Sequence, residues 1–188
     1  MWISLVMMPL TVAMLTGNVP DADAGKGAVT AEQIRINPRD GLRMKNNEPF
    51  TGEVYGYYHN GEVATADRFV DGKRHGFSRN FFPDGRLGYE VWFVDGKRHG
   101  GSRTWWANGT LRSSSLYVND LPHGESWGWY PDGKKFKLAR YQMGEPTGLQ
   151  QAWRKNGKLF RNFEIRNGRL YGLNNADLCV EIVDEESS

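Results

Sequence analysis

The sequence predicts an all-β fold: an elongated single-layer antiparallel meander of about five 24-residue β-hairpin repeats with terminal caps. Three observations predict it. The hexapeptide DGKRHG occurs at 71–76 and again at 95–100. Glycines recur with a period of 24 residues from Gly52 to Gly172. Aromatic residues make up 13% of the chain, and with 23 glycines they favour short strands joined by tight turns over a helical bundle.

Three glycine series define the repeating unit. One glycine opens each unit, a second stands nine residues further on, and a third stands twenty residues further on. The series are Gly52, Gly76, Gly100, Gly124, Gly148 and Gly172; Gly61, Gly85, Gly109, Gly133 and Gly157; and Gly72, Gly96, Gly144 and Gly168, with Asp120 in the one exceptional place. Self-similarity at a fixed period indicates a repeat architecture, in which each unit packs on its neighbours.

Two strands and two turns are expected in each unit. Asn or Asp precedes every glycine of the second series, as in Asn108–Gly109, and Asp71, Asp95 and Asn167 precede three glycines of the third. Such dipeptides predict two-residue type I′ turns, in which both central residues have positive φ. DGKRHG is therefore expected to connect one hairpin to the next. A two-residue turn at 108–109 would also place Trp106 opposite Leu111.

Residues 1–24 have the features of a signal peptide. The apolar run MWISLVMMPLTVAML is followed by Ala22-Asp23-Ala24, a small-x-small pattern with cleavage expected after Ala24. No Lys or Arg precedes the apolar run, so an uncleaved membrane anchor and a misassigned start are the alternatives. We expect export to the periplasm, the cell surface or the medium, or membrane attachment if the leader is uncleaved.

Caps are expected at both ends of the repeat sheet, because each unit is stabilised mainly by its neighbours. We assign residues 25–46 to a linker and N-terminal cap, residues 47–172 to the repeat sheet, and residues 173–188 to a C-terminal cap strand with an acidic tail. GLRMK at 41–45 is expected to be the last strand of a degenerate leading repeat. The single cysteine, Cys179, lies in the cap strand and cannot form an intramolecular disulfide.

The repeating unit resembles a known family. Its pattern, G-x4-[aromatic]-x2-[N/D]-G-x7-[F/Y/I]-x-x-G-x3-G over residues 52–172, is similar to the MORN repeat, and more closely to its bacterial variant. The resemblance implies a repeat sheet. For function it implies a lipid-contacting, scaffolding or accessory module, and the variant family is often labelled antitoxin-like.

Two aromatic columns are expected to run along the sheet. The first consists of Tyr57, Phe81, Trp105, Trp129 and Trp153; the second follows directly and consists of Tyr58, Phe82, Trp106 and Tyr130, interrupted by Arg154. Neighbouring residues of a strand point to opposite faces, so both faces carry aromatic rings. The first column is interpreted either as core packing or as an exposed surface for a partner. On the second interpretation Phe81, Trp105, Trp129 and Trp153 are binding residues.

A basic column and a histidine column accompany the connecting turns. Lys73, Arg74, Lys97 and Arg98 are candidate contacts for anionic lipid or an acidic protein surface, the alternative being ordinary solvated turn residues. His75, His99 and His123 occupy equivalent positions, which lie ~10 Å apart in a sheet. That separation is too large for a shared metal ion. We therefore expect connector residues there and no metal site.

The sequence favours binding over catalysis. It contains no H-E-x-x-H, C-x-x-C, G-x-S-x-G or Walker-type motif, so neither an enzyme nor a cofactor is expected. The net charge of +2 is too small to favour nucleic acid. The predicted function is a non-enzymatic repeat module that mediates protein–protein interaction at the cell envelope or outside the cell, with an unknown protein partner. The alternatives are an antitoxin or immunity protein that neutralises a cognate toxin, and peripheral binding to anionic lipid.

Overall fold

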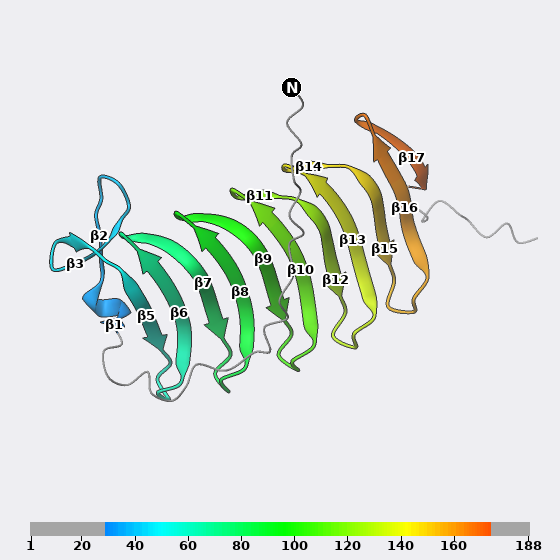
Figure 1. The fold of residues 1–188 in the computed structure, drawn as a ribbon. Coiled ribbons are helices and arrows are strands. Elements are labelled where there is room, and N and C mark those ends of the chain that lie inside the picture. Colours follow the sequence, from blue (N-terminus) through cyan, green and yellow to red (C-terminus); the bar gives the residue numbers. More distant parts are fainter. Residues whose placement is uncertain (1–28, 174–188) are drawn as a thin grey trace, which may run out of the picture.

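The computed structural model describes residues 29–173. The predicted signal peptide, cap strand LCVEIV, Cys179 and acidic tail lie outside the described residues. Within them the chain is almost entirely β, and its one helical element is the 3-10 turn η1, Ala31–Gln33. Successive strands pair side by side in one long, open layer (Figure 1). The predicted all-β antiparallel meander of hairpin repeats is confirmed.

Each hairpin consists of two antiparallel strands, and consecutive hairpins are hydrogen-bonded to each other. The main strands are β5 Gly52–Tyr57, β6 Val63–Val70, β7 Lys73–Phe81, β8 Leu87–Val94, β9 Lys97–Trp105, β10 Leu111–Val118, β12 Gly124–Trp129, β13 Lys135–Gln142, β15 Gly148–Trp153, β16 Leu159–Arg166 and β17 Arg169–Leu173. Two short strands, β11 Leu121–Pro122 and β14 Glu145–Pro146, pair with β10 and β13 beside the connecting turns.

The N-terminal end of the sheet is covered by short elements. β1, Val29–Thr30, pairs with β5 in parallel, and β2 Arg35–Ile36, β3 Arg43–Lys45 and β4 Glu48–Pro49 form a separate three-stranded sheet. Val29, Phe50, Val54 and Phe69 form a buried cluster at this end. The segment at 41–45 thus contains a strand, as expected, but this strand belongs to the small sheet and not to the meander.

The connecting turns have the predicted type I′ geometry. Both central residues are left-handed, with φ of 47° at Asp71 and 77° at Gly72. The turn Asn119–Asp120, which lacks a glycine, has the same geometry, with φ of 50° and 70°. Asn and Asp tolerate this region better than other non-glycine residues, which explains why the exceptional Asp120 does not disrupt the repeat.

The type I′ prediction is wrong for the second glycine series. In each of these loops only the glycine has positive φ. Trp106 N–H donates to Thr110 O at 2.8 Å, and Gly109 N–H donates to Trp106 O at 2.8 Å, which closes a three-residue loop. Asn108 favours this loop because its Oδ1 accepts a hydrogen bond from Thr110 N–H at 3.0 Å and its Nδ2 donates to Pro131 O of the next hairpin at 2.8 Å.

The longer loop shifts the register of each hairpin. Leu111 lies opposite Trp105 and Ser113 lies opposite Thr104, so Arg112 is an extra, bulged residue. The predicted pairing of Trp106 with Leu111 is therefore wrong. Equivalent shifts occur in the other long hairpins, with extra residues at 64, 88, 136 and 160. A bulge of this kind reverses the alternation of faces along the strand.

The register defines two faces of the sheet. The hydroxyl face carries Ser102, Thr104, Ser113, Ser115 and Ser126, together with the rings of Phe93 and Tyr117. The tryptophan face carries Trp92, Trp105, Trp127, Trp129 and Trp153. More side chains are buried on the hydroxyl face, where Val91 is 1% exposed and Val54, Phe69 and Ala139 are also buried.

Candidate functional site

The first aromatic column lies on the tryptophan face. Each member ends its strand, and in each hairpin the residue opposite it precedes the bulge. The opposite residues are Leu87 for Phe81, Leu111 for Trp105, Lys135 for Trp129 and Leu159 for Trp153. These rings are half-buried, and Tyr57 at the start of the column is 48% exposed. The structure thus places Phe81, Trp105, Trp129 and Trp153 in one row on one face.

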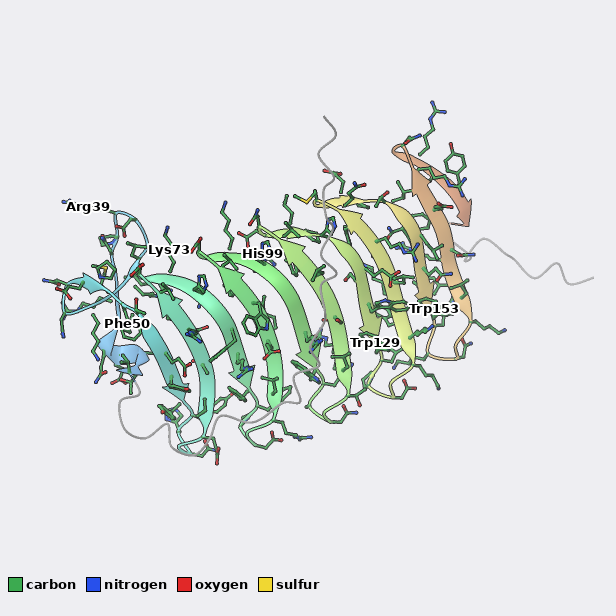
Figure 2. The ribbon with its side chains drawn as sticks, viewed as in Figure 1. Arg39, Phe50, Lys73, His99, Trp129 and Trp153 are labelled. Carbon is green, nitrogen blue, oxygen red and sulfur yellow. The ribbon has the colours of Figure 1, made fainter. Side chains whose placement is uncertain are left out.

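Three tryptophans of this face form a stack with a lysine, here called the tryptophan cluster: Trp127, Trp129, Trp153 and Lys135. The ring of Trp127 lies 6.2 Å from that of Trp129 and 6.3 Å from that of Trp153, at interplanar angles of 21° and 14°. Lys135 Nζ lies 5.2 Å from the Trp127 ring centre and 5.7 Å from that of Trp153, within the range of a cation–π interaction. Figure 2 shows Trp129 and Trp153 on successive hairpins toward the lower edge of the sheet.

Trp127 was missed in the sequence analysis, because it belongs to neither aromatic column. Its position two residues before Trp129 in β12 was the available signal, since alternate residues of a strand share a face. The Trp127 indole N–H donates to Glu125 Oε2 at 2.9 Å, and Arg140 donates to Glu125 Oε1 at 2.8 Å. The hydrogen bond from Trp127 has the larger effect and the one from Arg140 the next, and both hold the pKa of the Glu125 carboxyl below its usual value. An ionised Glu125 therefore fixes the orientation of Trp127.

The second aromatic column links neighbouring hairpins. Tyr58 Oη donates to Phe81 O at 2.7 Å, Trp106 Nε1 to Trp129 O at 3.0 Å, and Tyr130 Oη to Trp153 O at 2.8 Å. In every case the acceptor is the first-column residue of the next hairpin. The second column therefore fixes the backbone from which the first column projects.

Two second-column residues, Trp106 and Tyr130, also contact the bulged residue of their own hairpin. The guanidinium of Arg112 lies 4.5 Å from the ring centre of Trp106, and the rings of Tyr130 and Phe136 are 5.1 Å apart. At the position where the column is interrupted the roles are exchanged, because the guanidinium of Arg154 lies 5.3 Å from the ring of Phe160. A cation–π contact between the column position and the bulged residue is therefore kept, with the cation now supplied by Arg154 and the ring by Phe160.

The four basic candidates do not form a uniform surface. The guanidinium of Arg74 lies between the rings of Phe69 and Phe93, at 5.9 and 5.6 Å, and that of Arg98 lies 4.2 Å from the ring of Tyr117. Arg74 Nη2 is also 3.4 Å from Asp67 Oδ2, and Arg98 Nε is 3.1 Å from Asp120 Oδ1. These arginines therefore stabilise the sheet. Lys73 and Lys97 are exposed, and Figure 2 shows Lys73 at the upper edge.

The histidines contact the connecting turn of the next unit. His75 Nδ1 lies 3.5 Å from Asp95 Oδ1, and His99 Nδ1 lies 3.4 Å from Asn119 Oδ1. His123 Nδ1 accepts a hydrogen bond from Met143 N–H at 3.4 Å. The column thus consists of connector residues. Between residues 29 and 173 no group of three or more His, Cys, Asp or Glu residues is arranged to hold a metal ion.

No protein-family model matches this chain, and a search of curated proteins finds none similar to it. The resemblance of the repeating unit to the MORN repeat therefore stays a prediction based on the residue pattern. In the part of the chain that the structure describes, there is no helix of the length and hydrophobicity needed to cross a membrane.

Proposed function

We propose that this protein is a non-enzymatic repeat module that binds a partner protein at the cell envelope or outside the cell. The observation that carries the proposal is the tryptophan cluster, which presents three stacked indoles and a cation on the open face of a regular sheet. The row of Phe81 and Trp105 continues this surface toward the N-terminal hairpins.

The surroundings of the cluster extend its apolar surface. Trp92, Leu116 and Leu159 lie on the same face, and all three are large apolar side chains that are more than one third exposed. Leu159 lies directly opposite Trp153 of the cluster, and large exposed apolar side chains gathered on one face are typical of an interaction site. Isolated exposed residues would not support the same conclusion.

The cluster is also suited to binding energetically. Tryptophan is enriched among the residues that contribute most to protein–protein affinity. The hydrogen bond from Trp127 to Glu125 and the mutual stacking of the indoles restrict the rings before a partner arrives. Less side-chain entropy is then lost on association, and this increases affinity.

The test compares two variants with aromatic rings removed from opposite faces. Trp129→Ala/Trp153→Ala removes two rings of the cluster. Phe136→Ala instead removes the ring of the bulged residue next to Lys135, which is 44% exposed and packs against Tyr130 on the other side of the sheet. Each chain is immobilised, exposed to an extract of envelope and secreted proteins from the source cells, and the captured proteins are identified by mass spectrometry. Near-ultraviolet circular dichroism checks that every variant is folded.

A protein captured by the wild type and by Phe136→Ala, but lost with the double variant, supports the proposal. Equal capture by all three chains, or no specific capture, contradicts it. If the captured protein kills cells that lack this chain, the partner is a toxin and the antitoxin hypothesis is favoured. If the wild type instead sediments with anionic vesicles through Lys73 and Lys97, the lipid hypothesis is favoured.

A further inference from the structure

The hydroxyl face contains a hollow of about 500 Å³ behind the tryptophan cluster, between β9, β10, β12 and β13. Small residues form its floor, and larger side chains rise around them. The floor includes Thr104, Ser113, Ser126 and Gly128, and the side chains around it include Trp106, Arg112, Phe136 and Lys137. We propose that this hollow is a second binding site, for an acidic saccharide whose sugar ring carries a carboxylate. Trp127 and Trp129 also border the hollow, but their register places their side chains on the opposite face, where the protein-binding surface proposed above lies.

The bulges create the hollow. Arg112 and Phe136 are the extra residues of two neighbouring hairpins, so they stand at its rim instead of following the strand alternation. Gly128 lies between them in register with Ser113 and Lys137. A Cβ atom at Gly128 would lie 3.4 Å from the Phe136 ring and 3.7 Å from Lys137 Cβ, so any larger side chain would enter the space in front of the floor.

The hollow is positively charged. From β9 to β16 the residues in register on the hydroxyl face include Lys137 and Arg161, with Arg112 at a bulge, and include no Asp or Glu. Glu125 and Glu164 lie in register on the other face. Among the described residues neither Arg112 nor Lys137 forms an ion pair with a carboxylate.

Two carboxylates in the loops that join these strands are paired with other cations. Asp120 accepts a hydrogen bond from Arg98, and Asp132 lies 3.2 Å from Lys134 Nζ. Both acids are thus occupied in the loops at the edges of the sheet. The hollow therefore favours an anion, which would gain charge-assisted hydrogen bonds from Arg112 and Lys137.

The other lining groups match a polyhydroxylated ring. The lining hydroxyls of Thr104 and Ser113 are 2.6 Å apart, and that of Ser126 is 2.7 Å from Ser115 Oγ, which stands just outside the lining. Each hydroxyl pair uses one of its two hydrogens internally, so one donor and several acceptor lone pairs remain for a ligand. The exposed ring of Phe136 offers an apolar surface to the C–H face of a sugar. A few polar groups among aromatic side chains are typical of small-ligand sites.

Nucleic acid fits this hollow less well. Arg112 already covers the ring of Trp106 at 4.5 Å, which limits stacking of a base there. A polynucleotide also gains its affinity from many phosphate contacts along a basic track, whereas the hollow offers two cations. A short acidic oligosaccharide satisfies the two cations, the hydroxyls and the aromatic surface together.

The test is calorimetric titration of the full chain with tetragalacturonate. Its neutral counterpart is the fully methyl-esterified tetramer, and inorganic phosphate and vesicles containing phosphatidylglycerol are separate probes. The variants are Lys137→Gln and Arg112→Gln/Lys137→Gln. The matched control is Lys135→Gln, because Lys135 is only two residues from Lys137 but the bulge at Phe136 places it on the tryptophan face.

We expect the wild type and Lys135→Gln to bind tetragalacturonate equally. Lys137→Gln should weaken binding about tenfold, as the loss of one charge-assisted hydrogen bond does, and the double variant should weaken it further. The neutral ester should bind at least tenfold more weakly than the acid. Because Lys137 is exposed, the single variant keeps the fold even if Arg112→Gln destabilises it.

Four results would overturn the proposal. In the first, the wild type does not bind tetragalacturonate at any concentration up to millimolar; in the second, it binds the acid and the ester equally. In the third, Lys135→Gln loses as much affinity as Lys137→Gln. In the fourth, phosphate or vesicles bind more tightly than the saccharide through Arg112 and Lys137. None of them depends on capture of a protein partner by the tryptophan cluster, so the two proposals can fail independently.

Discussion

Trp106→Ala tests how one hairpin stabilises the next. The Trp106 side chain is half-buried on the hydroxyl face, donates Nε1–H to Trp129 O at 3.0 Å and carries Arg112 against its ring at 4.5 Å. Removing it loses a hydrogen bond worth about 1 kcal/mol and a cation–π contact worth about 0.5–1 kcal/mol. Half of the roughly 3–5 kcal/mol lost when a fully buried tryptophan is truncated adds about 2 kcal/mol. The expected total is about 3–4 kcal/mol.

The matched variant is Trp105→Ala, which truncates the neighbouring ring on the tryptophan face. Trp105 is equally half-buried, against Leu111, but within the described residues it lacks the hydrogen bond and the cation–π contact that Trp106 makes, so its truncation should cost only about 2 kcal/mol while weakening partner binding. Urea unfolding followed by circular dichroism measures both free energies. In thermal melts the Trp106 variant should lose about 6–16 °C, since 1 kcal/mol corresponds to roughly 2–4 °C in a chain of this size.

Trp106→Phe separates the hydrogen bond from the packing. It keeps an aromatic ring beside Arg112 but removes the donor to Trp129 O, so we expect a loss of about 1 kcal/mol. Phe82 occupies the same place in the preceding unit, which shows that a ring without a donor is compatible with the fold. If Trp105→Ala proves more destabilising than Trp106→Ala, the hydroxyl face is not the better-packed side and the assignment of the two faces' roles is refuted.

Three further predictions follow from the repeat and its turns. Deletion of residues 100–123 removes one whole unit and keeps every hairpin in register, so it should preserve the β circular-dichroism spectrum. Deletion of only twelve residues joins mismatched half-units and should unfold the chain. Equal unfolding by both deletions would contradict the view that each unit is stabilised by its nearest neighbours. Gly109→Ala should destabilise by about 1 kcal/mol in urea unfolding, because Gly109 has φ of 85° while no atom lies within 4 Å of the added Cβ; an unchanged free energy would show that the loop relaxes. The Glu125 pKa lies below its ordinary value of 4.5, so its contribution to stability is present above that pH and is lost as the pH falls through the lower, folded-state pKa. NMR titration of the Glu125 carboxyl should show its pKa rising toward 4.5 in Trp127→Phe, and no change would mean that the indole hydrogen bond has no role.

The sequence by itself determined the repeat, its period and its all-β character. These features depend on the backbone conformations that short stretches of residues prefer, whatever the rest of the fold does. A type I′ turn needs positive φ at two adjacent positions, and Asp71–Gly72 and Asp95–Gly96 meet that need without help from the rest of the fold. Aromatic and β-branched runs between such turns favour strands for the same local reason.

The tertiary structure decided which turn the other Asn-Gly and Asp-Gly pairs form. Asn108 makes one hydrogen bond within its loop and another to Pro131 of the next hairpin, and the second partner is 23 residues away. A type I′ turn at Asn108–Gly109 would have been locally acceptable. The contact between hairpins that favours the three-residue loop exists only after the sheet has formed.

The tertiary structure also decided which face each side chain occupies. One bulged residue per hairpin places Lys135 with the tryptophan cluster and Lys137 in the hollow, although they are two positions apart. The tertiary structure likewise brought Trp153 of the adjacent hairpin against Trp127, and it placed Arg74 and Arg98 against aromatic rings. Strand register depends on pairing between residues far apart in the chain, and a shift of one residue moves a side chain to the opposite face. For this reason the aromatic columns could be read from the sequence, whereas the surfaces they form could not.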